Sequence, residues 1–160
     1  AIRADTPDLQ AEPFCSDEFH LVCRSDHPLA KVPRGRPSAI AVEDLAQWPF
    51  IHMARHSSVR QFLEAALHPQ AMKSVMEVEQ LATVMGMVRA GLGISVIPAL
   101  TLFHFQQQGL VTRALNWPAL NRQIYLVRRR DRSLSSAAQA MYSLLMEHRP
   151  SIETFPPARR

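Results

Sequence analysis

The chain has 160 residues, of which 47% are hydrophobic and 20% are charged, with a formal net charge of +4. This composition is typical of one globular domain or two small lobes, and it excludes a disordered or fibrous chain. The longest apolar stretch, Leu92–Leu102, is interrupted by Gly93 and Pro98 and is far shorter than the ~18 residues that a membrane span needs.

The charged and cysteine residues exclude several classes of site. Arginines cluster at 128–132 and at the end of the chain without interleaved aromatic residues, so we interpret them as a solvated face and not as a nucleic-acid site. Cys15 and Cys23 match neither a zinc motif nor CxxC, and we expect plain thiols. His52 and His56 are four residues apart, but Ser57 makes a continuous helix through both unfavourable, so we expect no metal and no cofactor.

Predicted elements alternate between strands and helices along the chain. Strands are expected at 19–23, 50–53, 74–78, 93–97, 110–114 and 122–128. Helices are expected at 58–67, 79–90, 98–108 and 134–148, the last capped by Ser133, with a short turn at 42–46. This alternation predicts an α/β fold with a mostly parallel sheet, whose ligands bind at strand ends. Proline and glycine near 31–38 and charges at 129–133 indicate two exposed connections.

The segment from Met85 to Pro98 combines a helix end, a buried strand and the start of another helix. Gly91 is suited to the left-handed conformation that ends a helix, and Pro98 is suited to a first helical position. Gly93 precedes the strand, where the absence of a side chain lets another backbone or a ligand approach closely.

The turn before residue 60 is the best candidate for ligand chemistry. Val59, Phe62, Leu63 and Ala66 form an apolar stripe, so a helix begins here with Ser57 or Ser58 as its cap. Its first N–H groups, the helix dipole and the serine hydroxyls favour a carboxylate or phosphate, and nearby arginines add positive charge. The alternative is that the serine is only a helix cap.

The sequence contains none of the common catalytic motifs. The sequence has no GxSxG, HExxH, P-loop or GxGxxG, and its carboxylates show no paired spacing, so we expect no enzyme and no catalytic residue.

The order of several segments resembles the effector-binding domain of LysR-type transcriptional regulators over roughly Ala1 to His148. The segments are Phe19-His20-Leu21-Val22-Cys23, Asp26-His27-Pro28-Leu29-Ala30, Asp44-Leu45, Trp48-Pro49-Phe50-Ile51, Ser57-Ser58-Val59-Arg60, Gly91-Leu92-Gly93-Ile94 with Pro98, and Arg122-Gln123-Ile124-Tyr125-Leu126-Val127. The resemblance implies a type 2 periplasmic-binding-protein fold, with two Rossmann-like lobes and a cleft for a small effector between them.

The resemblance also implies how the chain is divided. Residues 1–32 and 129–150 are expected to form a partial lobe I, residues 33–128 lobe II, and residues 151–160 a tail. The family's effector domain opens with a strand, a helix and a second strand that are not found here, and a winged helix-turn-helix precedes it. We therefore expect a truncated first lobe, in which Phe19, Leu21, Val22 and the apolar face of the last helix lose partners and leave a strand edge and an apolar patch exposed.

The expected function is the sensing of a small, anionic effector that controls DNA binding by the parent protein. The effector-binding residues implied are Arg3, Ser57, Ser58, Val59, Arg60, Gly91, Gly93 and Ile94. We expect a cytoplasmic homo-oligomer that contacts DNA only through the absent helix-turn-helix and does not bind a membrane. The alternative is a solute-binding protein of the same fold that serves a transporter; a signal peptide upstream would indicate it, and a helix-turn-helix would indicate the regulator.

Overall fold

The computed structural model describes residues 7–31, 40–115 and 117–150, so Arg3 and the predicted tail at 151–160 lie outside the described residues. The chain packs as two compact units, one formed by residues up to Asp17 and from Arg122 onward, the other by Glu18–Asn121. The lobe division predicted from the sequence, at 32/33 and 128/129, differs from this one at both boundaries. The reason is that the second half of the long strand β1 (Leu9–Arg24) pairs with strands of the second unit.

The second unit contains a sheet in which all strands but β1 run in one direction. β2 (Phe50–Met53) is parallel to β3 (Ser74–Val78), and a single parallel bridge between Phe50 and Ile94 links β2 to the start of β4 (Ser95–Pro98). β1 is antiparallel to both β4 and β5 (Leu110–Ala114) and lies between them. The mostly parallel sheet that the sequence predicted is therefore interrupted by one reversed strand.

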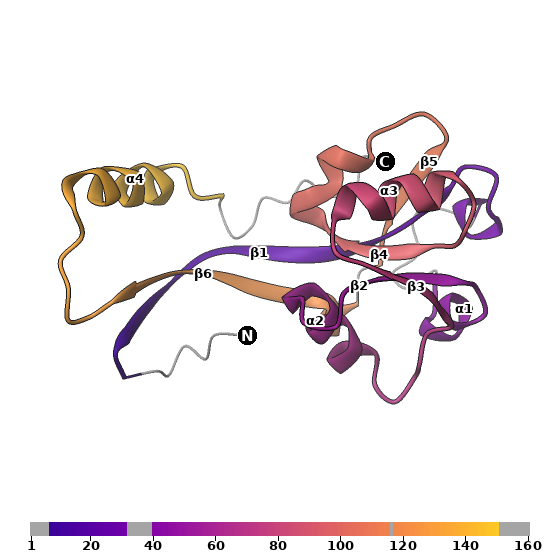
Figure 1. The fold of residues 1–160 in the computed structure, drawn as a ribbon, viewed down its shortest axis with the longest axis horizontal. Coiled ribbons are helices and arrows are strands. Elements are labelled where there is room, and N and C mark those ends of the chain that lie inside the picture. Colours follow the sequence, from indigo (N-terminus) through magenta and orange to yellow (C-terminus); the bar gives the residue numbers. More distant parts are fainter. Residues whose placement is uncertain (1–6, 32–39, 116, 151–160) are drawn as a thin grey trace. The chain divides into compact units, whose positions relative to one another are not determined.

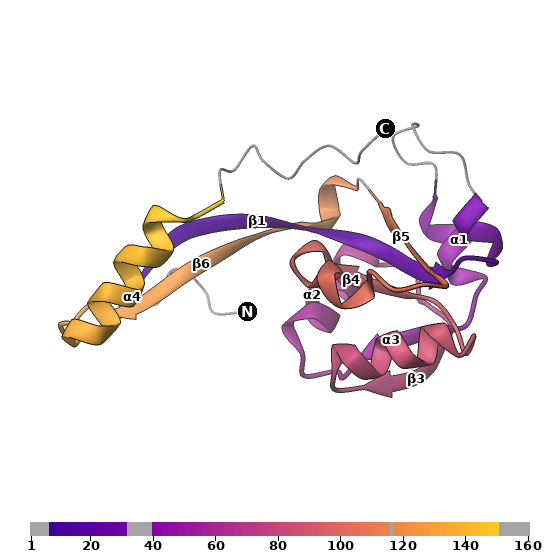
Figure 2. The same cartoon turned by 90° about the horizontal axis from the view of Figure 1, so that it is seen from above.

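Two hydrophobic cores cover the two faces of this sheet, because successive side chains of a strand point to opposite faces. Phe50 and Val96 belong to the first core, with Leu63 and Leu67 of helix α2 (Ser58–Leu67) and Leu45 of α1 (Val42–Ala46). The second core joins strand residues with α3 (Leu81–Arg89) and the 3₁₀ helix η2 (Ala99–Phe105); its buried members are Val22, Ile51, Val84, Val88, Ile97 and Phe105. In Figure 1, α3 lies above β4 and α2 lies below it; Figure 2 shows the same elements from above.

The first unit pairs β1 with β6 (Asn121–Arg129) and carries α4 (Ser136–Glu147). Arg122 donates to the fully buried carboxylate of Asp17 at 2.7 Å, and Gln123 donates to the Cys15 carbonyl at 2.7 Å. Tyr142 of α4 donates to Glu12, and the Arg128 guanidinium lies 5.3 Å from its ring centroid. These contacts attach α4 to β1 through polar groups.

The apolar face of α4 is exposed, as the sequence predicted. Met141, Leu144 and Leu145 are 58%, 52% and 36% exposed, and none of the residues of α4 is buried. The same expectation was wrong for Phe19, Leu21 and Val22, which are at most 1% exposed because β4 and β5 flank this part of β1.

Two element predictions were wrong in detail. The cap of α4 is Ser135, whose hydroxyl accepts from the Ala138 N–H at 3.3 Å, and not Ser133. The predicted helix 98–108 is a shorter 3₁₀ helix, η2, preceded by Pro98. The Thr101 hydroxyl donates to the Pro98 carbonyl oxygen at 2.7 Å. This bond occupies a carbonyl that would accept a backbone N–H bond in an α-helix.

Two short 3₁₀ helices lie next to the long strands β1 and β6. The 3₁₀ helices η1 (Pro28–Lys31) and η3 (Pro118–Leu120) follow β1 and precede β6. Among the described residues, none of the helices has the length and apolar character that crossing a bilayer requires.

The glycines near β4 have the conformations that the sequence indicated. Gly91 follows α3 with a φ of 80°, in the left-handed region. A Cβ on Gly93 would lie 2.5 Å from the Pro49 carbonyl oxygen, so this glycine permits the approach of another backbone. That oxygen accepts from the Ile94 N–H at 2.9 Å, and the approach therefore joins β2 to β4.

We predict opposite effects for alanine at two glycines. Gly93→Ala should lower the free energy of unfolding by more than ~2 kcal/mol, because the backbone at Pro49 must move. Gly86→Ala, in the interior of α3 with no atom within 4 Å of the added Cβ, should raise it by about 0.5–1 kcal/mol. Urea denaturation measures both, and a Gly93→Ala chain as stable as the wild type would contradict the close approach.

His52 of β2 is a buried polar residue whose protonation affects stability. It is 4% exposed and its ring lies 4.4 Å from that of Phe50. Burial, reinforced by the positive charge of Arg60 and opposed by Glu64 and Glu77, lowers the pKa of His52 from 6.5 to about 4. The folded chain therefore favours the neutral imidazole.

A pH dependence follows from this lowered pKa. The unfolded chain binds a proton at His52 at higher pH than the folded chain does, so stability is complete above pH 6.5 and falls as the pH drops towards 4. The loss should reach up to ~3 kcal/mol. His52→Gln should lose this component, and thermal unfolding of both chains between pH 7 and 4 measures the difference. Equal pH profiles would contradict a neutral, buried His52.

Candidate ligand site at the sheet edge

The start of α2 follows the carboxyl end of β2, at the edge of the sheet where parallel strands end. Ser57 has extended backbone angles, and its hydroxyl oxygen accepts from the Arg60 N–H at 3.1 Å, so it is the cap that the sequence predicted. Ser58 is exposed, and Val59 packs in part against the first core. The N–H groups of Ser58 and Val59 lie in the first turn, where a helix offers no acceptor of its own. Both N–H groups are therefore without a helical acceptor.

The arginines near this turn contribute less positive charge than the sequence suggested. The Arg60 side chain is 7% exposed and donates to Glu64 at 2.6 Å, with Glu77 at 3.8 Å from the same guanidinium. Arg55 is exposed but is paired with Glu77 at 3.2 Å. Carboxylates of the chain itself therefore balance both guanidinium groups, and the N–H groups with the helix dipole are the main features that favour an anion.

The segment from Gly91 to Ile94 lies apart from the α2 start. Gly93 and Ile94 contact Pro49 and Phe50 at the amino end of β2, whereas Ser57 follows its carboxyl end. Ile94 is fully buried, and Gly91 contacts the Arg24 side chain. The α2 start and the Gly93-Ile94 segment thus lie at opposite ends of one strand, and Gly91 and Gly93 have backbone roles in the positions where the structure places them.

A small cavity that the sequence did not indicate lies at the same edge as the α2 start. Because β1 is reversed, its residue Phe19 lies opposite Pro98, the carboxyl end of β4. Phe19 also stacks on Phe62 of α2, with ring centroids 5.3 Å apart. The cavity has a volume of about 190 Å³ and is lined by Glu18, Phe19, Trp117, Pro118, Leu120 and Asn121.

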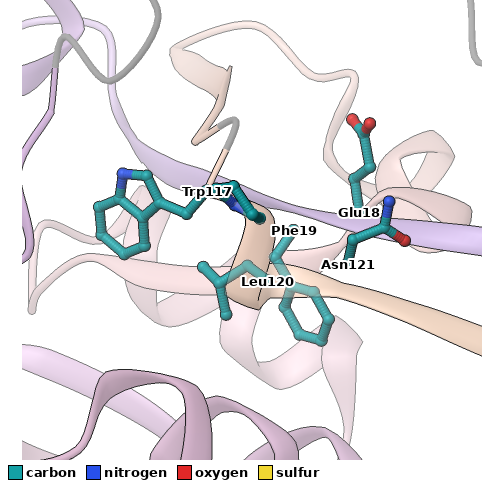
Figure 3. A pocket seen from close by; sticks show the side chains of 6 residues that line it. Glu18, Phe19, Trp117, Leu120 and Asn121 are labelled. Atoms are coloured by element: carbon teal, nitrogen blue, oxygen red, sulfur yellow. The ribbon is translucent and has the colours of Figure 1, made fainter.

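Figure 3 shows the side chains around this cavity. Glu18 and Asn121 lie next to each other on one side, and the Trp117 indole lies on the other. The indole is oriented by its N–H, which donates to the Ile40 carbonyl at 3.1 Å. An apolar wall with a few polar groups is typical of small-ligand sites. The sequence prediction missed Trp117; its position just after the predicted strand 110–114 is the signal that could have indicated this edge.

Neither cysteine nor metal chemistry is supported by the described residues. Within the described ranges, no three His, Cys, Asp or Glu side chains gather as a metal site requires. Cys15 and Cys23 are free and buried. Burial raises the pKa of the Cys23 thiol to about 11 and also raises the pKa of Cys15, so both are protonated and weakly nucleophilic near neutral pH.

The two serines of the α2 start should differ in their effect on stability. Ser57→Ala removes the cap and should lower the free energy of unfolding by about 1 kcal/mol. Ser58→Ala removes an exposed hydroxyl and should change it by less than ~0.5 kcal/mol. Thermal unfolding measures both, and an equal loss in the two variants would show that Ser57 is not the cap in solution.

Comparison with known sequences assigns the family. The model of the LysR substrate binding domain matches residues 1–150. The HTH-type transcriptional regulator YfeR of Shigella flexneri is 36% identical over 148 residues, covering 88% of this chain and 44% of that protein. The regulator YbhD of Escherichia coli (strain K12) is 33% identical over 136 residues, covering 84% and 41%. The chain therefore spans less than half the length of these curated relatives.

Solved structures agree with this fold. The effector binding domain of QuiR in complex with shikimate has a TM-score of 0.74 at 24% identity, covering 89% of this chain and 66% of that one. The regulatory domain of CcmR from Synechocystis PCC6803 in complex with 2-PG has a TM-score of 0.72 at 22% identity, covering 89% and 68%. The chain belongs to the LysR substrate-binding domain family and has its periplasmic-binding-protein-like α/β fold, as the sequence resemblance predicted.

Proposed function

We propose that this chain is the effector-sensing domain of a LysR-type transcriptional regulator and that it binds a small, anionic metabolite. The family match over residues 1–150 supports the regulator, since the relatives named above are transcriptional regulators. The observation that supports an anionic ligand is the geometry of the α2 start. There Ser57 caps the helix, and the N–H groups of Ser58 and Val59 are left for a ligand.

The proposed ligand contacts are hydrogen bonds from the backbone and from hydroxyl groups. A carboxylate at this turn accepts from the Ser58 and Val59 N–H groups and from a serine hydroxyl, and the helix dipole adds to these charge-assisted bonds. Arg60 and Arg55 are already paired with Glu64 and Glu77, so they orient the turn and do not contact the anion directly. Arg3, Gly91, Gly93 and Ile94 remain candidates proposed only from the family resemblance.

Regulation follows when the ligand binds one arrangement of the protein better than another. Only such a difference in affinity shifts an equilibrium, and DNA binding by the regulator would change with it. The proposal places the regulator in the cytoplasm as a homo-oligomer, with DNA contacts outside the effector domain, and assigns no reaction to it. The relatives named above favour this reading over a solute-binding protein of the same fold.

Calorimetric titration with a panel of small carboxylic acids tests the proposed site. The acid that binds best should lose ~1–3 kcal/mol of binding free energy in the Ser57→Ala, Ser58→Ala double variant, because the charge-assisted hydroxyl bonds are lost. The primary amide of the same acid should bind more weakly than the acid, because it lacks the charge that the helix start favours.

Ser135→Ala is the matched control. It removes the corresponding cap of α4, where Ser135 accepts from the Ala138 N–H at 3.3 Å, so it should cost similar stability without changing affinity. Unchanged affinity in the double variant, or a cationic molecule as the best ligand, would place the site elsewhere.

A further inference from the structure

A single carboxylate of β3 contacts both sides of the turn from which α2 begins. The Oε1 atom of Glu77 lies 3.2 Å from the Nε atom of Arg55 and 3.8 Å from the Nη2 atom of Arg60. Arg55 precedes the Ser57 cap in the chain, and Arg60 follows it and donates its backbone N–H to the cap. The Glu77 side chain therefore reaches the turn from a neighbouring strand.

Backbone hydrogen bonds hold β3 against the same turn. The Ala54 N–H donates to the Val78 carbonyl oxygen at 2.8 Å, and the Ser57 N–H donates to the Ala54 carbonyl oxygen at 2.9 Å. β2 pairs in parallel with β3 up to this point. The position of Glu77, next to Val78, thus depends on bonds that do not involve its carboxylate, and the turn keeps its place when that charge is removed.

The ionic side chains at the turn balance one another. Arg55 and Arg60 carry two positive charges, and their partners Glu64 and Glu77 carry two negative charges, so the four groups sum to zero. The side chains of Glu64 and Glu77 are 55% and 36% exposed, so a bound ligand meets both charges. The helix dipole adds the equivalent of about half a positive charge at the α2 start.

This balance favours one negative charge on the ligand over two. A first carboxylate gains the hydrogen bonds of the Ser58 and Val59 N–H groups. A second negative charge on the same molecule meets guanidinium groups that are already engaged, and the carboxylates of Glu64 and Glu77 repel it.

We propose that Glu77 is a specificity-determining residue of the anion site, and that its charge makes the site prefer a monoanion to a dicarboxylate or a phosphate dianion. The inference rests on the proposed function, because it needs an anion bound at the α2 start. It narrows the ligand class to small monocarboxylates. Glu64 takes part in the same charge balance, but Glu77 is the carboxylate that contacts both arginines.

Succinamate and succinate are matched probes, because an amide in the first replaces one carboxylate of the second. The isotope-labelled 160-residue chain is titrated with each at pH 8 and low ionic strength, and NMR follows the Ser58 and Val59 N–H signals. Both probes should give saturable shifts of these signals. Succinate should bind no more tightly than succinamate, in spite of its additional charge.

Glu77→Gln removes the negative charge and keeps the shape of the side chain. It should raise the affinity for succinate relative to succinamate by about 3-fold, since the second carboxylate is no longer repelled and Arg55 is released. High salt should reduce this change, because screening weakens interactions between exposed charges. Glu77→Asp keeps the charge and should retain the wild-type ratio of the two affinities.

Glu43→Gln is the matched control. Glu43 is an exposed residue of α1, which precedes the amino end of β2, whereas the turn follows the carboxyl end. The variant makes the same change in net charge away from the turn, so its ratio of affinities should equal that of the wild type.

The outcomes separate this inference from the proposed function. If neither probe shifts Ser58 and Val59 in the wild type, the anion site is absent and the inference falls with it. If both probes bind there with the same ratio of affinities in the wild type and in Glu77→Gln, the inference alone is overturned. A wild-type preference for succinate, or equal changes of the ratio in Glu77→Gln and Glu77→Asp, would also overturn it.

Discussion

The contact between the backbones at Pro49–Ile51 and Gly93–Ser95 determines how the second unit is arranged. The Ile94 N–H donates to Pro49 and the Ile51 N–H donates to Ile94, each at 2.9 Å, and the Ser95 hydroxyl donates to the Ile51 carbonyl at 2.8 Å. Only glycine at position 93 leaves room for the Pro49 carbonyl. These bonds fix β2 beside β4 in a parallel direction, and the two hydrophobic cores form on the faces that result.

The carboxyl edge of the sheet follows from that direction. With β2, β3, β4 and β5 running alike, the α2 start, Pro98 and the segment before β6 all lie where strands end. Ligand sites often form at such an edge because helices begin there and present free N–H groups. The reversed strand β1 brings Phe19 to the same edge, where it stacks on Phe62 and lines the cavity of Figure 3.

The sequence predicted the features that depend on local pattern. The apolar stripe from Val59 to Ala66 located α2 and its Ser57 cap, and Gly91 was recognised because a left-handed residue ends α3. Local pattern is less informative where two nearby serines could each cap a helix. It indicated Ser133 as the cap of α4, whereas the cap is Ser135. It also did not indicate that the Thr101 hydroxyl would favour a 3₁₀ helix after Pro98.

Features that depend on contacts between residues distant in the sequence could not be predicted from local pattern. Glu77 of β3 lies 3.8 Å from the guanidinium of Arg60 in α2, a contact that the spacing within α2 does not reveal. Ser57 follows the carboxyl end of β2 and Gly93 lies beside its amino end, which the sequence does not show because strand order is set by pairing between segments. The cavity of Figure 3 likewise depends on side chains that only the folded unit brings together.

Amide hydrogen exchange tests most directly whether the α2 start binds the effector. The exchange of each backbone N–H is measured by NMR in the free chain and in the chain saturated with its tightest-binding carboxylic acid. The account predicts that Ser58 and Val59 exchange fast in the free chain, since they lack helical acceptors, and become the most strongly protected by the acid. Protection that increases at Gly91, Gly93 and Ile94 while Ser58 and Val59 stay unchanged would contradict it.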